Sequence, residues 1–370
     1  MLSGRADKPG NGDEAMLWRL TDEQQLYAET LQNWLDKVAG STQVREWMDS
    51  GDPGVFEGRY VTDGLSGVGV GEELGGQGGG LVELALTAEA LGGSAAPSGA
   101  WLATVLAIPA LAKRPDEVAL AVGGATVTSC FPAEVAPDQV PILRADSAGR
   151  ITGSVRRVLA ADRAVHLLVL AQSDDTPQLR LVQASDDRVA ISSHQLLDRS
   201  RSVADVRMNS VPSEAVEIDV REFLDGAAAR GAVLIAADSL GAAERMLNLS
   251  RDYSLERKQF GVPIGSFQAV KHALAQMVVA VEAARSVVYF AAASVEGGTD
   301  EHLLHAAAAK AQVTAEAVRT ADSALTVHGA VGYTWEHDLH LFYKRARLNE
   351  QLFGAPQAWN ERIARGLGLF

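Results

Sequence analysis

Apolar residues that recur every three or four positions mark the C-terminal part of the chain. Two such series stand on either side of residues 251–266: Val233, Ala237, Leu240, Ala243 and Leu247 before them, and Phe267, Val270, Leu274, Met277 and Val281 after them. This spacing places the apolar side chains on one face of an α-helix. Gly261, Pro263 and Gly265 lie between the two series and do not fit inside a helix. The pattern predicts two long helices that meet at a tight connection.

Helical spacing also predicts shorter helices towards both ends of the chain. They cover residues 81–92, 97–111, 302–325, 331–347 and 356–367. Near the N-terminus, Thr21 and Gln24 form a capping box that opens one more helix, which runs through Leu35. Residues 65–80 read LSGVGVGEELGGQGGG. Because no strand–turn–helix unit surrounds these glycines, a flexible loop is predicted there rather than a dinucleotide-binding loop.

The middle of the chain has short runs of β-forming residues that glycine, proline and aspartate separate. The runs lie at residues 118–122, 126–131, 139–143, 150–155, 165–171, 179–182 and 189–191, and two edge strands are expected at 205–211 and 215–220. Short strands at regular spacing, without helices between them, favour a small antiparallel barrel or sandwich.

These elements predict an α+β chain in three successive parts. The expected divisions are a disordered lead at residues 1–16, an α-helical domain at 17–115, a β-domain at 116–221 and a helical bundle at 222–370. The bundle should hold four to five helices, and no internal repeat is evident.

Composition and charge limit the classes of protein and the cellular compartments that fit this chain. The 370 residues carry a net charge of −14 and 47% are hydrophobic, so a globular chain is expected whose acidic surface does not suit nucleic acid. A single cysteine, Cys130, excludes an internal disulfide and fits a reducing cytoplasm. No apolar run is judged long enough for a membrane span, and the first 15 residues lack the apolar core of a secretory signal.

The connection between the two long helices carries the most suggestive chemistry. Arg257, Gln259 and Phe260 supply a fixed cation, an amide and an aromatic ring at a helix end. That combination suits a phosphate or a nucleotide. The residues alone favour the simpler interpretation of a solvated helix end with one ring tucked in, because short basic motifs often match by chance.

Two blocks in this region resemble acyl-CoA dehydrogenases. Residues 253–268 contain Tyr-x3-Arg-x-Gln-Phe-Gly, then Pro-Ile and Phe-Gln, and are similar to the R-x-Q-F-G segment of that family. Residues 327–340, VHGAVGYTWEHDLH, are similar to its Q-x-x-G-G-x-G-Y segment. Near the N-terminus, residues 73–78 and the E-A-L-G at 89–92 resemble two further family features. The likeness covers about residues 17–368 and implies the fold order helices, β-domain, helical bundle.

The resemblance implies that this chain contributes to an FAD site. In the family, both segments of one subunit reach the adenosine and pyrophosphate of a flavin held mainly by its neighbour. The matching residues are Arg257, Gln259, Phe260, Ile264, Gln268, Thr326, Gly329 and Ala330. Thr326 replaces a glutamine and Ala330 a glycine, so a shorter side chain and an added Cβ weaken the match. Donation to a neighbour's flavin is therefore predicted to be partly intact.

The family's contacts to the flavin ring are missing. Its T-E-P-x-x-G-S-D-like and W-I-T-N/S-like runs have no counterpart in the corresponding zones, which read SCFPAEV at residues 129–135 and VRRVLAAD at 155–162. The strands around these zones do resemble the family. The resemblance therefore predicts that this chain holds an isoalloxazine ring of its own poorly.

The family's catalytic base is missing as well. Phe353 stands at the position of the carboxylate in the usual Y-E-G-T-like segment, and Gly231, 22 residues before Tyr253, stands at the position used by a minority. Neither side chain can accept a proton. The acids nearby in the sequence are Asp238, Glu244 and Glu350, which are predicted to be helix-surface charges; Glu244 and Glu350 are the weak alternatives for a relocated base.

Other polar residues have structural interpretations. His328 is expected to make a helix-start contact, and the 336–340 run with Glu336, His337, Asp338 and His340 to pack helices rather than bind metal. No metal site is predicted. The basic groups Arg251/Arg257/Lys258 and Lys344/Arg345/Arg347 could face phosphates, but solvated helix faces explain them as well.

Three hypotheses follow. The favoured one is a subunit without the base in a heteromeric FAD-dependent acyl-CoA dehydrogenase, which desaturates an acyl-CoA together with a homologous, base-bearing partner as α2β2. It resembles the degenerate subunits of actinobacterial enzymes of steroid side-chain degradation. The alternatives are a self-sufficient homotetramer with a relocated base and a flavin-free scaffold subunit. A cytoplasmic location without a membrane span is expected in each case.

Overall fold

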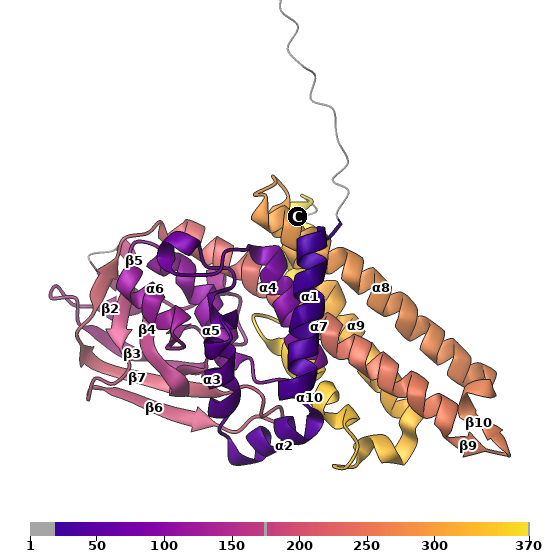
Figure 1. Cartoon of the computed structure of the whole chain (residues 1–370). Helices are drawn as coiled ribbons and strands as arrows, with labels where there is room; N and C mark the ends of the chain where they lie inside the picture. Colours follow the sequence, from indigo (N-terminus) through magenta and orange to yellow (C-terminus); the bar gives the residue numbers. More distant parts are fainter. Residues whose placement is uncertain (1–18, 174–175, 369–370) are drawn as a thin grey trace, which may run out of the picture.

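The computed structural model describes residues 19–173 and 176–368. The molecule is elongated, with the sheet at one end, the N-terminal helices in the middle, and a small hairpin at the tip of the long C-terminal helices at the other end (Figure 1). The expected disordered lead lies outside the described residues. The division at residues 115/116 and 221/222 stays a prediction.

The N-terminal part is helical, as predicted. Its α-helices are α1 (Asp22–Val38), α2 (Ser41–Ser50), α3 (Gly54–Thr62), α4 (Leu81–Gly93), α5 (Gly99–Ala107) and α6 (Pro115–Val122). The capping box is present: the Gln24 N–H donates to Thr21 Oγ1 at 3.2 Å, and the Thr21 N–H donates to Gln24 Oε1 at 3.0 Å. Short 3-10 turns lie at Leu65–Gly67 (η1), Glu72–Leu74 (η2) and Ile108–Leu111 (η3).

The glycine-rich stretch at 65–80 is a loop, but a tightly packed one. The Gly69 N–H bonds to the Gly78 carbonyl at 2.8 Å, and the Gly78 N–H to the Val70 carbonyl at 2.8 Å. A Cβ at Gly76 would lie 2.1 Å from the Val70 carbonyl oxygen. Close backbone approach, rather than phosphate binding, explains this glycine.

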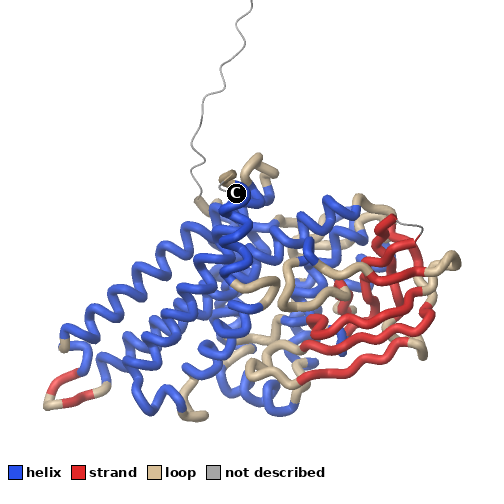
Figure 2. The backbone as a smooth tube through the Cα atoms, turned by 180° about the vertical axis from the view of Figure 1, so that it is seen from behind, coloured by secondary structure: helices blue, strands red, loops and turns tan. Residues whose placement is uncertain are grey.

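The middle part of the chain forms one curled sheet, which lies at one end of the molecule (Figure 2). Its strands are β1 (Thr126–Ser129), β2 (Leu143–Ala145), β3 (Ile151–Leu159), β4 (Ala164–Ser173), β5 (Thr176–Gln183), β6 (Val189–His194), β7 (Val203–Val211) and β8 (Glu214–Val216). The order is β6-β7-β3-β2-β4-β5-β8, with β1 paired to β4. Most neighbours are antiparallel, but β1 and β2 each run parallel to β4.

Three strand predictions need correction. Residues 118–122 are helical, because Pro115 at the first helical turn and the acids Asp116 and Glu117 start α6. The run at 139–143 is mostly not strand: a 3-10 turn, η4 (Pro137–Gln139), precedes β2, and Pro141 has no N–H for a ladder. The strand at 205–211 is not at an edge, since β7 lies between β6 and β3, whereas β8 is at the edge as expected.

The C-terminal part is built around α7, whose 37 residues are buried along most of their middle. The elements are α7 (Val220–Glu256), the hairpin β9 (Lys258–Gln259) and β10 (Val262–Pro263), η6 (Ile264–Ser266), α8 (Gln268–Glu296), α9 (His302–His328), η7 (Gly329–Tyr333), α10 (Leu339–Gln351) and α11 (Pro356–Gly366). The single helix predicted at 331–347 is wrong at its start. There η7 and an irregular turn precede α10, and Gly332 packs so closely on Leu339 that a Cβ would lie 3.0 Å from its Cδ2.

Helix α8 differs from one expectation. By length and composition alone it would pass as a membrane span, since its most apolar 18 residues have a mean hydropathy of 1.6. Only 39% of that stretch is buried within the chain. The prediction that no apolar run is long enough to span a membrane is therefore wrong for α8. The absence of a membrane span remains a prediction.

Candidate functional site

The residues predicted to reach a flavin lie at the tip of the bundle, far from the sheet. Phe260 and Gly261, with φ of 52° and 82°, form the tight turn of the β9–β10 hairpin. The Ile264 N–H donates to the Arg257 carbonyl at 2.8 Å and closes the connection between α7 and α8. The hairpin stands at the far end of the helices in both side views (Figures 1 and 2).

The side chains of this connection point to solvent. Phe260 is 93% exposed, so the alternative of a ring tucked into the helix end is wrong. Its ring contacts that of Phe267 edge-on, with centroids 6.1 Å apart. Arg257 and Lys258 are exposed and have no ion-pair partner among the described residues. Gln268 is exposed and Ile264 half-buried, so the cation, the amide and the ring remain available to another molecule.

The second predicted segment lies at the same end of the bundle. Tyr253 near the end of α7 stacks on His328, the last residue of α9, with ring centroids 4.6 Å apart. Thr326, Gly329 and Ala330 are exposed beside this stack, although the Thr326 hydroxyl donates to the Asp322 carbonyl at 2.9 Å. The structure thus brings the two sequence segments together on one surface.

His328 makes a different contact from the one predicted. It ends α9 rather than starting a helix, and its Nδ1 lies 2.8 Å from the Ala324 carbonyl oxygen. Burial lowers the pKa of the imidazole, so the neutral form is favoured at pH 7. A neutral ring between Tyr253 and His337 fits a packing role.

The two predicted base positions meet in space. A Cβ built on Gly231 in α7 would lie 3.1 Å from Cδ2 and 3.4 Å from Cε2 of Phe353, and 3.6 Å from Leu106 Cδ1 in α5. The ring is only 7% exposed. Two positions from which a carboxylate would serve the same substrate atom should lie close together. They do, and an aromatic ring and a glycine occupy them.

The segment predicted to flank a flavin ring touches the bundle directly. The Phe353 N–H donates to the Ala133 carbonyl at 2.6 Å. Arg362 of α11 pairs with Asp138 of η4, so a second contact joins the β-domain to the end of the chain. The next strand is tied to the same loop by the Arg157–Glu134 pair. These contacts hold the loop against the Phe353 backbone, although Ser129 Oγ and Glu134 Oε2 are buried without a hydrogen-bond partner.

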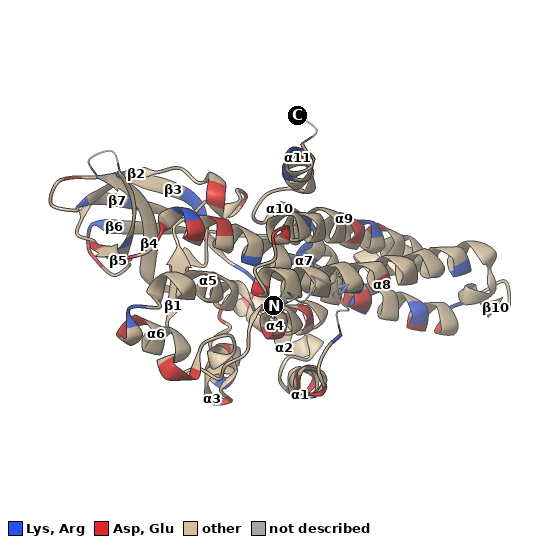
Figure 3. Cartoon of the chain, turned by 90° about the horizontal axis from the view of Figure 1, so that it is seen from above, with Lys and Arg blue, Asp and Glu red and all other residues tan. Residues whose placement is uncertain are grey.

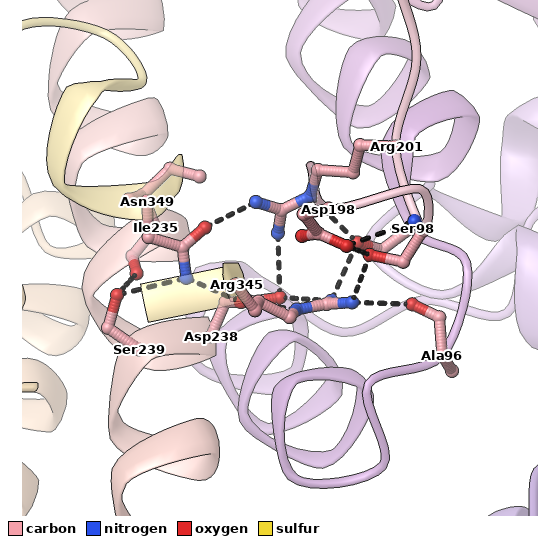
Figure 4. Close-up of polar contacts among 10 residues, drawn as sticks. Ala96, Ser98, Asp198, Arg201, Ile235, Asp238, Ser239, Arg345 and Asn349 are labelled. Atoms are coloured by element: carbon pink, nitrogen blue, oxygen red, sulfur yellow. Dashed lines mark hydrogen bonds and ion pairs between the residues drawn. The ribbon is translucent and has the colours of Figure 1, made fainter. Parts of the chain in front are cut away.

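A buried charge cluster joins α7 and α10 (Figure 4). The Asp238 carboxylate in α7 accepts from Arg345 of α10 at 2.6 Å and from Arg201 of the β6–β7 loop at 2.8 Å. Asn349 Nδ2 donates to the other carboxylate oxygen at 2.7 Å. Asp238 was predicted to be a helix-surface charge, and for Arg345 either a phosphate contact or a solvated helix face was expected. Both predictions are wrong, because the side chains of Arg345 and Asp238 are 0% and 2% exposed.

The cluster joins all three parts of the chain. Arg345 also donates to the Ala96 carbonyl at 2.7 Å and the Ser98 hydroxyl at 2.8 Å, both before α5. Burial by itself would raise the pKa of Asp238, but the two guanidinium groups outweigh it and lower the pKa. Asp238 is therefore a structural counter-ion, held charged by its two arginines, and is not available as a base.

Lys310 of α9 secures the segment that carries Phe353. Its fully buried ammonium donates to the carbonyls of Gly354, Asn349 and Glu350 at 2.9, 3.1 and 3.2 Å. These carbonyls end α10 and start the turn that follows it. Burial lowers the pKa of Lys310 to about 7. Sequence reasoning missed this residue and Arg201, although a lone lysine within the alanine run of α9 was a usable signal.

The two alternative bases are poorly placed. Glu244 lies 13 residues (244 minus 231) beyond Gly231 on α7, about 20 Å along the helix axis. Its carboxylate pairs with Arg285 at 2.8 Å and is 42% exposed, as a surface charge should be. Glu350 lies on α10 before Phe353, where its carbonyl is fixed by Lys310.

The other basic and acidic groups serve packing. Arg45 of α2 pairs with Asp338 at 2.7 Å and lies 3.1 Å from His340 Nε2. Lys344 stands 3.9 Å above the Trp335 ring. Within residues 19–173 and 176–368, no group of three or more His, Cys, Asp or Glu side chains is arranged to hold a metal ion. Charges on the long helices are scattered between uncharged stretches (Figure 3).

Comparisons with known proteins agree with this architecture. The family descriptions "Acyl-CoA dehydrogenase, N-terminal domain" and "Acyl-CoA dehydrogenase, C-terminal domain" match residues 21–117 and 224–368. The acyl-CoA dehydrogenase IpdE2 of Mycobacterium tuberculosis is 33% identical over 350 residues, which cover 92% of this chain and 96% of that protein.

Solved structures show the same fold. The ChsE4-ChsE5 complex from Mycobacterium tuberculosis matches with a TM-score of 0.83 and 27% identity, over 95% of this chain and 99% of that chain. The Tcur3481-Tcur3483 steroid ACAD matches with a TM-score of 0.84 over 94% and 98%, at 24% identity. The predicted order of helices, β-domain and helical bundle is confirmed. The chain belongs to the acyl-CoA dehydrogenase family of FAD-dependent oxidoreductases.

Proposed function

We propose that this chain is the subunit without the catalytic base in a heteromeric acyl-CoA dehydrogenase, and that it contributes contacts to the flavin of a homologous, base-bearing partner. The observation that carries the proposal is the packing of Phe353 on Gly231. Both positions predicted for the base carry residues that cannot take a proton, and the two positions adjoin each other. A residue elsewhere would have to reach into a space that the ring already fills.

The contact of the loop at residues 130–138 with Phe353 does not fit a flavin ring of this chain's own. The loop at residues 130–138 bonds to the Phe353 backbone and, through Asp138, to Arg362. One carboxylate oxygen of Glu134 pairs with Arg157, whereas the other, Oε2, is buried without a hydrogen-bond partner. An isoalloxazine placed between this loop and Phe353 would have to displace these contacts. We therefore derive no chemistry from a flavin bound there.

The tip of the bundle does fit part of a flavin held by another subunit. Arg257 would bind the pyrophosphate, because a free guanidinium pairs well with phosphate oxygens. Gln259 and Phe260 would contact the adenosine, together with Ile264, Gln268, Thr326, Gly329 and Ala330. When bound, the flavin supplies the acceptor for the hydride from the acyl chain. This chain's residues would only hold and orient its distal end.

The exposed face of α8 supports a partner subunit. Val278 and Val279 are 46% and 69% exposed on a helix whose opposite face is buried. An apolar face of this kind, next to the exposed tip, suits a protein interface. The solved relatives named above are complexes of two different chains, and one is called a steroid ACAD. We propose an α2β2 assembly in the cytoplasm, acting on a steroid side-chain CoA thioester.

Expressed alone, the chain is expected to be poorly soluble or nearly free of flavin. Co-expressed with its base-bearing partner, it should form a yellow, monodisperse complex. The reason is that contacts between the loop at residues 130–138 and Phe353 occupy the place of a flavin ring in this chain. In addition, the exposed apolar face of α8 needs a partner surface to pack against. Gel filtration with absorbance at the flavin bands measures both properties. A stable, yellow homo-oligomer with one flavin per chain would contradict the proposal and favour a self-sufficient enzyme; a stable complex without flavin would favour a scaffold.

Replacing Arg257 by alanine is expected to weaken flavin binding in the complex by about tenfold to a hundredfold. A charge-assisted guanidinium–phosphate contact contributes about 1.5–3 kcal/mol, and one exposed arginine adds little to folding. Arg251→Ala is the matched control, because Arg251 is exposed at the same helix end but pairs with Asp252 at 2.9 Å. Flavin retention after dilution and gel filtration is measured. Equal retention in both variants would exclude a role for Arg257 in trans.

A further inference from the structure

The Phe353 ring also occupies space beside the two predicted base positions. A general base must come within hydrogen-bond reach of the proton it removes, so the two base positions flank the space for the acyl α-carbon. In this chain the ring bridges that space: its edge stands 3.1 Å from where a Gly231 Cβ would be, and Leu106 closes it from α5 at 3.6 Å from the same point. With the ring 7% exposed, the gap between the two positions is filled.

The ring is fixed by its backbone. Phe353 has a φ of 57°, a conformation that non-glycine residues keep only when their surroundings hold them there. Three bonds do so. Its N–H donates to Ala133 at 2.6 Å, its carbonyl accepts from Trp359 Nε1 at 3.0 Å, and the next carbonyl, of Gly354, accepts from Lys310 at 2.9 Å. These bonds fix the backbone from three separate elements, and the packing of the ring on Gly231 beside Leu106 limits its rotation about χ1.

We infer that Phe353 is an internal plug, which fills the acyl position of this chain and excludes acyl thioesters from it. This inference rests on the proposed function, because the family resemblance defines the base positions. It goes beyond a missing base, since a subunit that merely lacked a carboxylate could still bind the substrate. The plug limits the complex to one acyl-CoA for each pair of chains. No unproductive acyl site in this chain then competes with the partner's site for substrate.

The test is the number of acyl-CoA sites in the complex of this chain with its partner. Butanoyl-CoA is titrated calorimetrically, with free CoA as the reference for binding that does not involve the acyl group. The wild-type complex is expected to show at most one acyl-dependent site per pair. Phe353→Ala should add one site per pair, because a four-carbon chain fits the space left by the ring. Phe342→Ala, an equally buried aromatic of α10, should add none.

The outcomes separate the inference from the proposed function. Two acyl-dependent sites per pair in the wild type would overturn the plug while leaving the heteromeric assembly intact. A folded Phe353→Ala complex without an additional site would overturn it as well. If Phe353→Ala does not fold, the number of acyl-dependent sites in Phe353→Leu and in the wild-type complex still tests the inference. Failure of the chain to assemble with a flavin-bearing subunit would instead contradict the proposed function, before any titration.

Discussion

Replacing Asp238 by asparagine is expected to destabilise the chain by about 3–5 kcal/mol, the usual cost of removing one partner from a buried ion pair. The carboxylate accepts from Arg345 at 2.6 Å and Arg201 at 2.8 Å, and neither arginine side chain is more than 1% exposed. The amide leaves both guanidinium groups without their main counter-charge. Since the cluster joins three parts of the chain, the loss should affect the whole fold. Unfolding by denaturant at fixed protein concentration measures it.

The matched control is Asp322→Asn, which removes a pair with Arg347 whose side chains are 54% and 42% exposed. Such surface pairs contribute about 0–1 kcal/mol, so the control should unfold almost like the wild type. The lowered pKa of Asp238 also predicts how stability depends on pH. The ionised carboxylate stabilises the fold fully above the ordinary aspartate pKa, about 3.9, and this stabilisation is lost as the pH falls below that value. Equal stability of the two variants would show that Asp238 is not the structural counter-ion.

Removal of a general base costs about 10²–10⁴ in rate, and we expect that loss from one glutamate of the partner and from none in this chain. Glu244→Gln and Glu350→Gln should leave turnover of the complex nearly unchanged. Glu244 is about 20 Å from Gly231 along α7 and is occupied by Arg285. Glu350 lies three residues (353 minus 350) before Phe353, about one turn or 5 Å away.

The Glu350 variant is the more stringent half of this experiment. Its backbone carbonyl accepts from Lys310 at 3.2 Å, so the end of α10 cannot turn towards Gly231 without losing that bond. Turnover, flavin content and unfolding midpoint are measured together. A large rate loss in Glu350→Gln with the other two unchanged would return the catalytic role to this chain and support the homotetramer with a relocated base.

The sequence predicts the fold well where one local signal decides. The capping box at Thr21 and the apolar spacing of α7 and α8 depend on neighbouring residues only, and these elements are where they were expected. Residues 118–122 show the limit. Their β-branched and apolar residues suit a strand, but the start signals at Pro115 and Asp116 act from outside the run and make it a helix.

In the candidate site, too, residues of a contiguous motif could be predicted from the sequence, whereas contacts between distant residues could not. The tip residues at 257–268 are recognisable because their motif is contiguous, and the structure adds that their side chains are exposed. Asp238 and Arg345 were misjudged because charges on a helix usually face solvent, and their burial depends on Arg201, 37 residues (238 minus 201) away in a different part of the chain. No local pattern contains that pairing. The contact of Gly231 with Phe353 is likewise a property of the tertiary fold.

The fixed backbone at Phe353 also bears on the restoration of a base in this chain. A glutamate restored at this position would enter an apolar space against Gly231 and Leu106, where an unpaired carboxylate is costly or stays protonated. The bonds from Ala133 and Arg362 would have to open as well before a flavin could enter. Under the proposed function, a glutamate at position 353 is therefore not expected to give this chain activity of its own without further changes around it.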